Sequence, residues 1–129
     1  MGEAVRVVAA VIREGDRVFA TQRGYGPHKD RWEFPGGKIE PGETPEQALA
    51  REIREELDTV VAVGEKIDQV EWTEGDRLLS LACYLCRVES GHLTLTEHES
   101  ARWIGRDEAE RLDWLPADRR VIEKGRLWA

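Results

Sequence analysis

The sequence predicts an α+β domain in which a mixed β-sheet lies between helices. Two pairs of segments rich in β-branched residues each flank a short polar turn, REGD at 13–16 and TEGD at 73–76. A third observation is a segment at 45–57 that has both the apolar spacing and the capping residues of a helix. Strand-like and helical segments follow each other in mixed order, which is typical of a mixed sheet flanked by helices.

The first hairpin is predicted to join AVRVVAAVI (4–12) to RVFATQR (17–23). The next segment, GYGPHKDR (24–31), has the Gly, Pro and Asp content of a loop. WEF (32–34) is short enough to be a brief strand before Pro35 and two glycines. The N-terminal quarter is therefore expected to be strand, turn, strand and loop.

The helix at 45–57 has a complete start signal. Thr44 is a favourable N-cap, Pro45 suits the first helical position, and Gln47 completes a capping box with Thr44. At about 100° per residue, one side of this helix is apolar and is expected to face the core. Its apolar stripe consists of Leu49, Ile53 and Leu57.

The C-terminal half is expected to add a second hairpin, two short strands and two helices. The hairpin strands are 60–72 and 77–88, the short strands are HLTLT (92–96) and ARWI (101–104), and the helices are 106–112 and 117–127, with Asp118 near the start of the second. No repeat or interdomain linker interrupts the chain. We therefore expect one domain over residues 1–129.

Composition limits the function classes. The formal net charge of -7 argues against binding to a nucleic-acid polymer, because that binding depends on clustered Lys and Arg. The longest apolar run near the start contains Arg6 and follows Glu3, so it resembles neither a signal peptide nor a membrane span. We expect a cytoplasmic protein without a membrane partner, either a monomer or a homodimer.

Cys83 and Cys86 form a C-x-x-C sequence, which in other contexts indicates a redox pair or half of a zinc site. In a strand, however, a spacing of three residues places the two thiols on opposite faces. No second Cys/His pair has zinc-finger spacing, and His28, His92 and His98 are scattered. Two buried strand thiols and ordinary loop histidines are the expected outcome.

Three carboxylates share one face of the predicted helix. Glu52, Glu55 and Glu56 lie at i, i+3 and i+4, where like charges repel by a few tenths of a kcal/mol per pair. An exposed acidic helix is one interpretation. The preceding Gly36 and Gly37 favour another, because glycines let the backbone approach a ligand closely and Mg²⁺ prefers carboxylate and carbonyl oxygens.

These residues resemble the Nudix box, G-x5-E-x7-R-E-U-x-E-E-x-G-U, where U is bulky and aliphatic. Gly37, Glu43 and the run Arg51-Glu52-Ile53-x-Glu55-Glu56 match it, while Asp58 and Thr59 depart from its last two positions. Asp tolerates the left-handed conformation that a helix exit needs. Nearly the whole chain is similar to the MutT branch of the family, especially its CTP pyrophosphohydrolases, which implies an α/β/α sandwich and hydrolysis of a nucleoside triphosphate to the monophosphate and pyrophosphate.

The resemblance implies a role for each acid. Glu52, Glu55 and Glu56 would hold Mg²⁺, or alternatively Mn²⁺, together with a carbonyl of the Gly36–Gly37 pair and with Glu97 from a later loop. Glu43 would orient the site through Arg51. Glu52 is the first candidate for the general base and Glu97 the second. The competing interpretations are a solvated loop acid for Glu97 and a simple i,i+4 partner of Glu55 for Arg51.

The resemblance also implies four substrate-binding residues. Arg23 would contact the triphosphate, and Phe34 and Trp32 are natural stacking partners for a base, although an aromatic residue beside a strand often belongs to the core. Asp118 falls where MutT has an Asn that reads the base. An ionised Asp only accepts hydrogen bonds, and cytosine offers an amino donor, so Asp118 favours a cytosine-type base. The alternatives are a surface cation for Arg23 and a helix cap for Asp118.

The sequence as a whole favours a MutT-type pyrophosphohydrolase of nucleotide-pool sanitation, with CTP, dCTP or a modified dCTP as first substrate. The second hypothesis is 8-oxo-dGTP, with relaxed use of both open. A third, from a different class, is a Nudix-like module that binds a nucleotide without cleaving it. Such modules typically lose box acids, whereas this chain keeps all of them.

Overall fold

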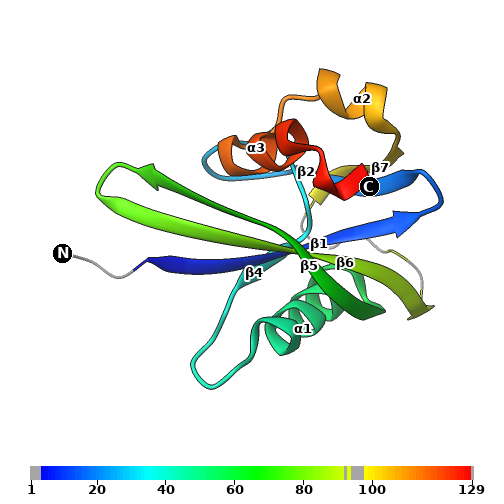
Figure 1. Cartoon of the computed structure of the whole chain (residues 1–129), viewed down its shortest axis with the longest axis horizontal. Helices are drawn as coiled ribbons and strands as arrows, with labels where there is room; N and C mark the ends of the chain where they lie inside the picture. Colours follow the sequence, from blue (N-terminus) through cyan, green and yellow to red (C-terminus); the bar gives the residue numbers. More distant parts are fainter. Residues whose placement is uncertain (1–3, 92, 94–97, 129) are drawn as a thin grey trace.

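The computed structural model describes residues 4–91, 93 and 98–128, and these residues form the predicted mixed sheet between helices. Figure 1 shows α1 on one face of the sheet and α2 and α3 on the other. The α/β/α sandwich is thus confirmed. The elements are β1 Val5–Glu14, β2 Arg17–Arg23, β3 Trp32–Glu33, β4 Gly36–Lys38, α1 Pro45–Leu57, β5 Thr59–Glu74, β6 Arg77–Gly91, β7 His98–Ile104, α2 Arg106–Arg111, α3 Pro116–Lys124 and the 3₁₀ helix η1 Arg126–Trp128.

Strand β1 is central to the sheet. It pairs in parallel with β6 from Val5 opposite Leu79 to Ile12 opposite Cys86, and antiparallel with β2 and β4. Strand β5 pairs antiparallel with β6 at the far edge, and β7 and β3 pair antiparallel with β2. Both predicted hairpins, β1–β2 and β5–β6, are confirmed; β2 has the predicted bounds, and the other three strands are one to three residues longer than expected.

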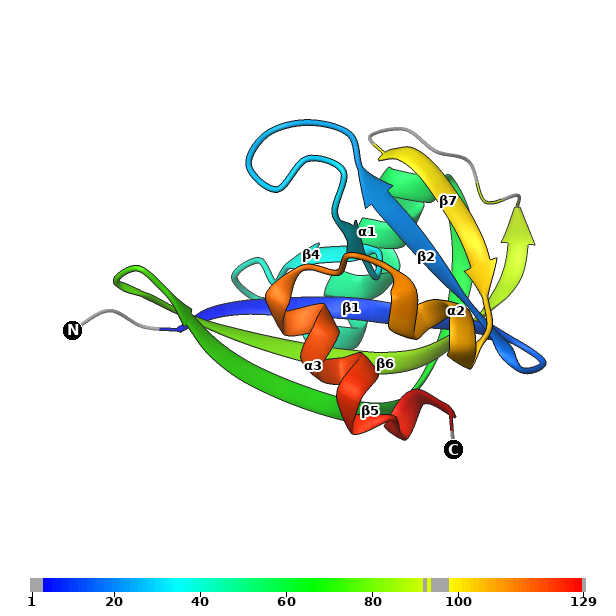
Figure 2. The ribbon, with the colours of Figure 1, turned by 90° about the horizontal axis from the view of Figure 1, so that it is seen from above.

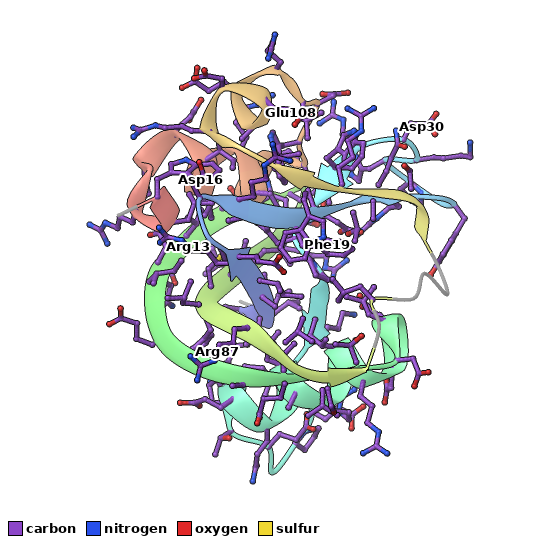
Figure 3. All side chains as sticks on the ribbon, turned by 90° about the vertical axis from the view of Figure 1, so that its right-hand side faces the viewer. Arg13, Asp16, Phe19, Asp30, Arg87 and Glu108 are labelled. Carbon is purple, nitrogen blue, oxygen red and sulfur yellow. The ribbon has the colours of Figure 1, made fainter. Side chains whose placement is uncertain are left out.

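The sheet has a hydrophobic core on each face. On the α1 side Val8, Leu49 and Ile53 belong to one buried cluster, and on the α3 side Val11, Leu81 and Val121 belong to the other. Phe19 points into the interior (Figure 3) and meets the ring of Trp103 nearly edge-on, with centroids 5.3 Å apart. Because side chains alternate along each strand, the sheet can serve two cores at once.

The two cysteines follow the same alternation. Cys83 lies in the core on the α3 side and Cys86 in the core on the α1 side, and both are buried free thiols. Burial raises the pKa of Cys86 to about 12 and raises that of Cys83 as well. The prediction of two separated structural thiols is therefore confirmed.

Helix α1 begins and ends where the sequence predicts. Thr44 accepts a hydrogen bond from the Gln47 N–H at 3.1 Å while the Gln47 side chain accepts one from the Thr44 N–H at 3.0 Å, which completes the capping box. Asp58 follows the helix at φ 50° and ψ 45°, the left-handed conformation that ends many helices. Asp thus fulfils the conformational role that glycine has in the Nudix box.

The C-terminal region differs from the prediction most at the end of its last helix. The helix expected at 117–127 ends at Lys124, because Gly125 adopts φ 72° and turns the chain into η1. The strand expected at 92–96 and the candidate acid Glu97 lie outside the described residues, apart from Leu93. Among the described helices, none has the length and apolar character needed to cross a membrane.

Candidate active site

Arg51 joins the acidic residues of α1 to the loop that precedes the helix. Its Nε and Nη2 donate to the two oxygens of Glu43, at 2.7 and 3.0 Å, and its Nη1 donates to Glu52 at 3.0 Å. Glu55, one turn along, is 3.4 Å from Nη1, and the Lys38 carbonyl accepts from Nη2 at 3.1 Å. Arg51 is therefore more than an i,i+4 partner of Glu55.

The Arg51–Glu43 contact is a bidentate ion pair, the strongest common form of such a contact. The hydrogen bonds from Arg51 hold the pKa of Glu43 below its ordinary value. Glu43 also accepts the backbone N–H of Glu40 at 2.9 Å, which fixes the turn before the helix. Glu43 is thus a positioning residue that keeps Arg51, and through it the α1 acids, in one arrangement.

Gly37 provides the space in which the Glu52 carboxylate lies. A Cβ atom at Gly37 would be 2.4 Å from Cδ of Glu52 and 2.6 Å from each of its oxygens. At Gly36, a Cβ atom would be 2.0 Å from the backbone oxygen of Val8 in β1. The two glycines are therefore required for different reasons, one for a functional side chain and one for strand packing.

The donors around Gly37 fit a divalent cation in chemistry. Glu52, Glu55 and Glu56 supply carboxylate oxygens on one face of α1, and Oε2 of Glu56 is buried. Hard oxygen donors of this kind suit Mg²⁺ or Mn²⁺. Within residues 4–91, 93 and 98–128, however, no three acid, His or Cys side chains converge closely enough to form a complete metal site. Glu97, the predicted further ligand, lies outside these residues.

A cleft of about 370 Å³ opens between the start of α3 and the sheet. Residues 7–9 of β1, 36–38 of β4 and 79–81 of β6 line it, and residues 115–118 close it from the α3 side. In Figure 2 this end of α3 lies above β1 and β4. The volume is in the range of small-molecule sites. Gly37, against which the Glu52 carboxylate lies, is among the lining residues, so the cleft approaches α1 at that point.

Asp118 lies in this cleft, almost completely buried. Its Oδ2 accepts a hydrogen bond from the backbone N–H of Phe34 at 2.9 Å. The N-cap of α3 is Leu115, three residues earlier, so Asp118 does not cap the helix. The ring of Phe34 also lines the cleft and packs against Trp114, with centroids 4.9 Å apart. Asp118 and Phe34 thus form one hydrogen-bonded unit at the cleft.

Burial raises the pKa of Asp118 to about 7. The nearby charge of Glu33 adds to this increase, while the Phe34 N–H and Arg23 oppose it. The carboxyl group is therefore close to half protonated at neutral pH, so it is present both as a pure acceptor and as a group that donates and accepts.

Arg23 and Glu33 stand between the cleft and the acids of α1. Arg23 Nη2 is 2.9 Å from Glu33 Oε1, and its Nη1 donates to the Pro27 carbonyl at 3.4 Å. Both residues line the cleft and also an adjoining hollow of about 250 Å³, which Gly36 and Glu56 share. Arg23, which the sequence predicts to contact the phosphates, therefore lies between the part of the site that contains Asp118 and the part that contains Glu56.

Comparison with known proteins agrees with this arrangement. Residues 3–125 match the NUDIX domain family. The chain belongs to the NUDIX family. The acid-bearing helix α1 and the loop before it are therefore the family's box, with Asp58 and Thr59 in place of its last two defined residues.

Individual relatives cover nearly the whole chain. A CTP pyrophosphohydrolase from Escherichia coli (strain K12) is 34% identical over 120 residues, which span 92% of this chain and 89% of the relative. An 8-oxo-dGTP diphosphatase from the same strain is 33% identical over 122 residues, 93% of this chain and 95% of the relative. The solution structure of the E. coli ORF135 protein has a TM-score of 0.83 and 34% identity, covering 94% of this chain and 87% of that one. The chain is a Nudix hydrolase.

Thr59, the second departure from the Nudix box, is accommodated by a local contact. Its hydroxyl donates to the Leu57 carbonyl at 2.8 Å, and the residue is buried at the start of β5. The hydroxyl therefore satisfies the backbone carbonyl of the last helical residue, and the polar side chain is not buried without a hydrogen bond. The two departures leave the position of α1 and its acids intact.

Trp32 is placed away from the cleft, in contrast to Phe34. It is buried in the core on the α3 side, bridges to Trp114 through the backbone, and has the guanidinium of Arg102 5.3 Å from its ring centroid. Among the described residues that line the cleft, Trp32 is absent. The structure gives no support to stacking of Trp32 on a base. Trp32 and Phe34 are two residues apart and belong to the same buried cluster, but of the two only Phe34 lines the cleft.

Two residues of the site were missed by sequence reasoning. Glu33 was passed over because a lone acid beside a strand has no distinctive spacing, yet it pairs with Arg23. His28 was read as an ordinary loop residue, but it lines the cleft, 3.0 Å from Glu74 of β5. Glu33 meets Arg23 only through the pairing of β2 with β3, and His28 meets Glu74 from a strand far along the chain. The sequence alone does not show either contact.

Proposed function

We propose that this protein is a Mg²⁺-dependent pyrophosphohydrolase that cleaves a nucleoside triphosphate of the CTP or dCTP type to the monophosphate and pyrophosphate. The observation that supports the base class is Asp118, a buried carboxylate at the floor of the cleft, hydrogen-bonded to the Phe34 N–H. The named activity of the CTP pyrophosphohydrolase relative agrees with this choice. The proposed role is sanitation of the cytoplasmic nucleotide pool.

The base is proposed to bind at the Asp118 end and the phosphates at the α1 end. The Asp118 carboxylate accepts the Phe34 N–H through Oδ2 and also a hydrogen bond from its own backbone N–H. Because an ionised carboxylate has about four lone-pair sites, it is proposed to accept a further hydrogen bond from the exocyclic amino group of cytosine. Phe34 supplies an apolar surface beside it. Arg23, between the two ends, donates to the phosphate chain.

The acids of α1 serve the reaction at the phosphorus atom. A divalent cation bound by Glu52, Glu55, Glu56 and Glu97 would neutralise phosphate charge and lower the pKa of a bound water. Glu52 lies against Gly37 at the cleft and is proposed to take the proton of the attacking water, with Glu97 as the competing base. Arg51 holds Glu52 by a 3.0 Å contact and is itself held by Glu43. Water is consumed and pyrophosphate leaves.

A second substrate, 8-oxo-dGTP, is favoured by a specific observation. Because the pKa of Asp118 is about 7, a large share of the molecules carry a protonated carboxyl group at neutral pH. That group both donates and accepts, as an Asn does, and so suits the O6 acceptor of a guanine-type base. An 8-oxo-dGTP diphosphatase is also among the relatives. We therefore propose cytosine nucleotides first and 8-oxo-dGTP second.

The test is pyrophosphate release from a panel of canonical and oxidised nucleoside triphosphates with Mg²⁺. The wild type is compared with Glu52→Gln, which removes the proposed base, and with Asp118→Asn, which keeps the shape of the side chain but not its charge. We expect release from cytosine nucleotides, a loss of about 10²-fold or more in Glu52→Gln, and a shift toward 8-oxo-dGTP in Asp118→Asn. Exposed Glu110→Gln on α2 is the control variant and should leave all rates unchanged.

Absence of release from every nucleotide would reject the pyrophosphohydrolase. Full activity of Glu52→Gln would reject its role as base and leave Glu97 as the candidate. Unchanged base preference in Asp118→Asn would reject base reading by Asp118 while leaving the hydrolase proposal intact.

A further inference from the structure

Helix α3 is fixed to the edge strand β5 by polar contacts at the end opposite Asp118. Lys124, in the last turn, has its Nζ 2.5 Å from Oδ1 of Asp68 and 3.3 Å from the Gln69 carbonyl. One turn earlier, Arg120 Nη1 donates to the Glu71 carbonyl at 2.8 Å. Figure 2 shows α3 running across β6 toward β5, so these contacts fix its far end.

Asp68 is an unusual residue for this position. Its side chain has no exposed surface, and in the described part of the chain its Oδ2 is buried without a hydrogen-bond partner. Oδ1 accepts the Gln69 N–H at 2.8 Å and faces Lys124, with Arg126 Nη1 3.9 Å away. A buried carboxylate costs several kcal/mol to desolvate, and an apolar pair of similar volume is often as stable. Stability alone therefore does not explain an ion pair here.

Asp68 is the last in a row of β5 side chains that face helix α3. Along β5, Trp72, Val70 and Asp68 alternate toward the α3 side, and Trp72 lines the cleft. Asp68 is directly opposite Cys83 of β6, and the register shifts between Lys66 and Asp68. Regular alternation from Trp72 through Val70 directs Asp68 to the α3 side, and the irregularity in the pairing lies immediately before it.

The same helix therefore carries the proposed base reader at one end and the ion pair at the other. Asp118 and Lys124 are six residues apart, which is about 9 Å along a helix axis. At the first turn, Asp118 accepts the Phe34 N–H, the Leu115 N–H donates to the Trp32 carbonyl, and Arg119 donates to the Leu112 carbonyl, so none of these contacts reaches β5. A rigid helix transmits a displacement of its last turn to its first.

We propose that Asp68 and Lys124 are positioning residues: their buried ion pair fixes α3 along β5 and thereby sets where Asp118 lies in the cleft and which base the enzyme prefers. This proposal rests on the base-reading role proposed for Asp118. It assigns to Asp68, which is not among the described residues that line the cleft, an effect on specificity that acts through α3.

The test uses two readouts, one of which needs no nucleotide. The first is the amide proton of Phe34 in ¹H–¹⁵N NMR spectra, which reports its hydrogen bond to Asp118. The second is the ratio of kcat/KM for CTP to that for 8-oxo-dGTP. Lys124→Met removes the cation, Lys124→Arg keeps it, and Asp68→Asn keeps the shape of the acid without leaving a buried charge. Ile122→Val, a core truncation on the same helix, is the matched control for lost stability.

We expect Lys124→Met and Asp68→Asn to shift the Phe34 amide resonance and to change the base ratio by about tenfold, as expected when a hydrogen bond to a charged group is weakened. Lys124→Arg should restore both readouts, and Ile122→Val should change neither. In an Asp118→Asn background, Lys124→Met should no longer alter the ratio, because the pair acts through Asp118.

An unchanged Phe34 resonance in Lys124→Met and Asp68→Asn would overturn the proposal whatever the substrate is. A changed ratio that persists in the Asp118→Asn background would also overturn it, because the effect would then bypass Asp118. Failure of the proposed function is recognised separately, by a wild-type enzyme that hydrolyses none of the nucleotides or by an Asp118→Asn variant with wild-type preference.

Discussion

Gly37→Ala should separate catalysis from folding in this protein. The added Cβ atom would be 2.4 Å from Cδ of Glu52 and 2.6 Å from both carboxylate oxygens. The atoms it meets are the far end of a flexible side chain, so the fold can absorb the change by moving that side chain. The backbone at Gly37 does not have a positive φ, and alanine is therefore conformationally acceptable there.

The size of the effect follows from the distance. Carbon atoms in contact are about 3.5 Å apart, so the Glu52 carboxylate must retreat by roughly 1 Å from Gly37. A misplacement of about 1 Å in a reacting group is enough to cost about 10²-fold in rate. Stability should change little, because alanine restricts the unfolded chain and offsets the cost of the side-chain shift by about 0.4–1 kcal/mol.

The assay is steady-state pyrophosphate release together with thermal unfolding. We expect kcat to fall about 10²-fold and Tm to stay within a few degrees of the wild type. Gly36→Ala is the contrasting variant, because its Cβ atom would be 2.0 Å from the backbone oxygen of Val8 and should destabilise the sheet. Gly37→Ala in a Glu52→Gln background should cost no further activity. Wild-type kcat in Gly37→Ala, or a large drop in its Tm, would refute the reasoning.

Three further predictions follow from charge and burial. Arg51→Lys keeps a cation but loses the bidentate contact, so kcat should fall about tenfold and the pKa of Glu43, followed by NMR titration, should rise toward its ordinary value; an unchanged Glu43 titration would contradict this. Because burial raises the pKa of Asp118 from 3.8 to about 7, the folded protein keeps a proton that the unfolded chain has released. The free energy of unfolding should therefore fall by roughly 1.4 kcal/mol per pH unit between these values and level off above pH 7. Denaturant titrations should show this slope in the difference between the wild type and Asp118→Asn, because Glu43 and the other titrating groups contribute to both proteins. Cys83 and Cys86 should not react with a thiol reagent until the protein is unfolded, when two thiols should be counted; rapid reaction in the native state would show that the strands open.

The local features of this fold could be predicted because each has its cause within a few residues. The capping box at Thr44 fixes the start of α1, and the two Gly-Asp turns fix both hairpins. Even the departure at Asp58 was interpretable, since Asp adopts the left-handed conformation that ends the helix. The box spacing likewise predicts which acids hold the metal ion, because it combines three carboxylates on one helical face with a preceding glycine pair at fixed separation; their role stays a prediction.

The remaining features depend on strand order, which no local pattern contains. The parallel pairing of β1 with β6 brings residues some 70 positions apart to one cleft. The pairing of β2 with β3 and the packing of α3 then place Glu33, Arg23 and Asp118 near each other. Trp32 and Phe34 are equivalent in sequence as possible stacking residues and pack in the same core, and only the position of the cleft separates them. The burial of Asp68 could not be predicted for the same reason. A single acid in a long strand is expected to face solvent, and its partner Lys124 comes from a distant helix.

A net charge of -7 does not by itself favour binding of a polyanionic substrate, so the charges around the cleft have to be considered separately. At physiological ionic strength the Debye length is about 8 Å, so the charges that matter are those near the cleft and not the total. Arg23, Lys38 and Arg77 line the cleft, but Glu33, Glu74 and Asp118 line it as well. With Arg51 occupied by its four acidic neighbours, the side chains alone leave little positive charge for a triphosphate. The carboxylates of α1 would repel the substrate unless a divalent cation lies between them. The acidic cluster is therefore useful only in an enzyme whose substrate arrives with a metal ion, and this accounts for the crowding of carboxylates that first marks the sequence.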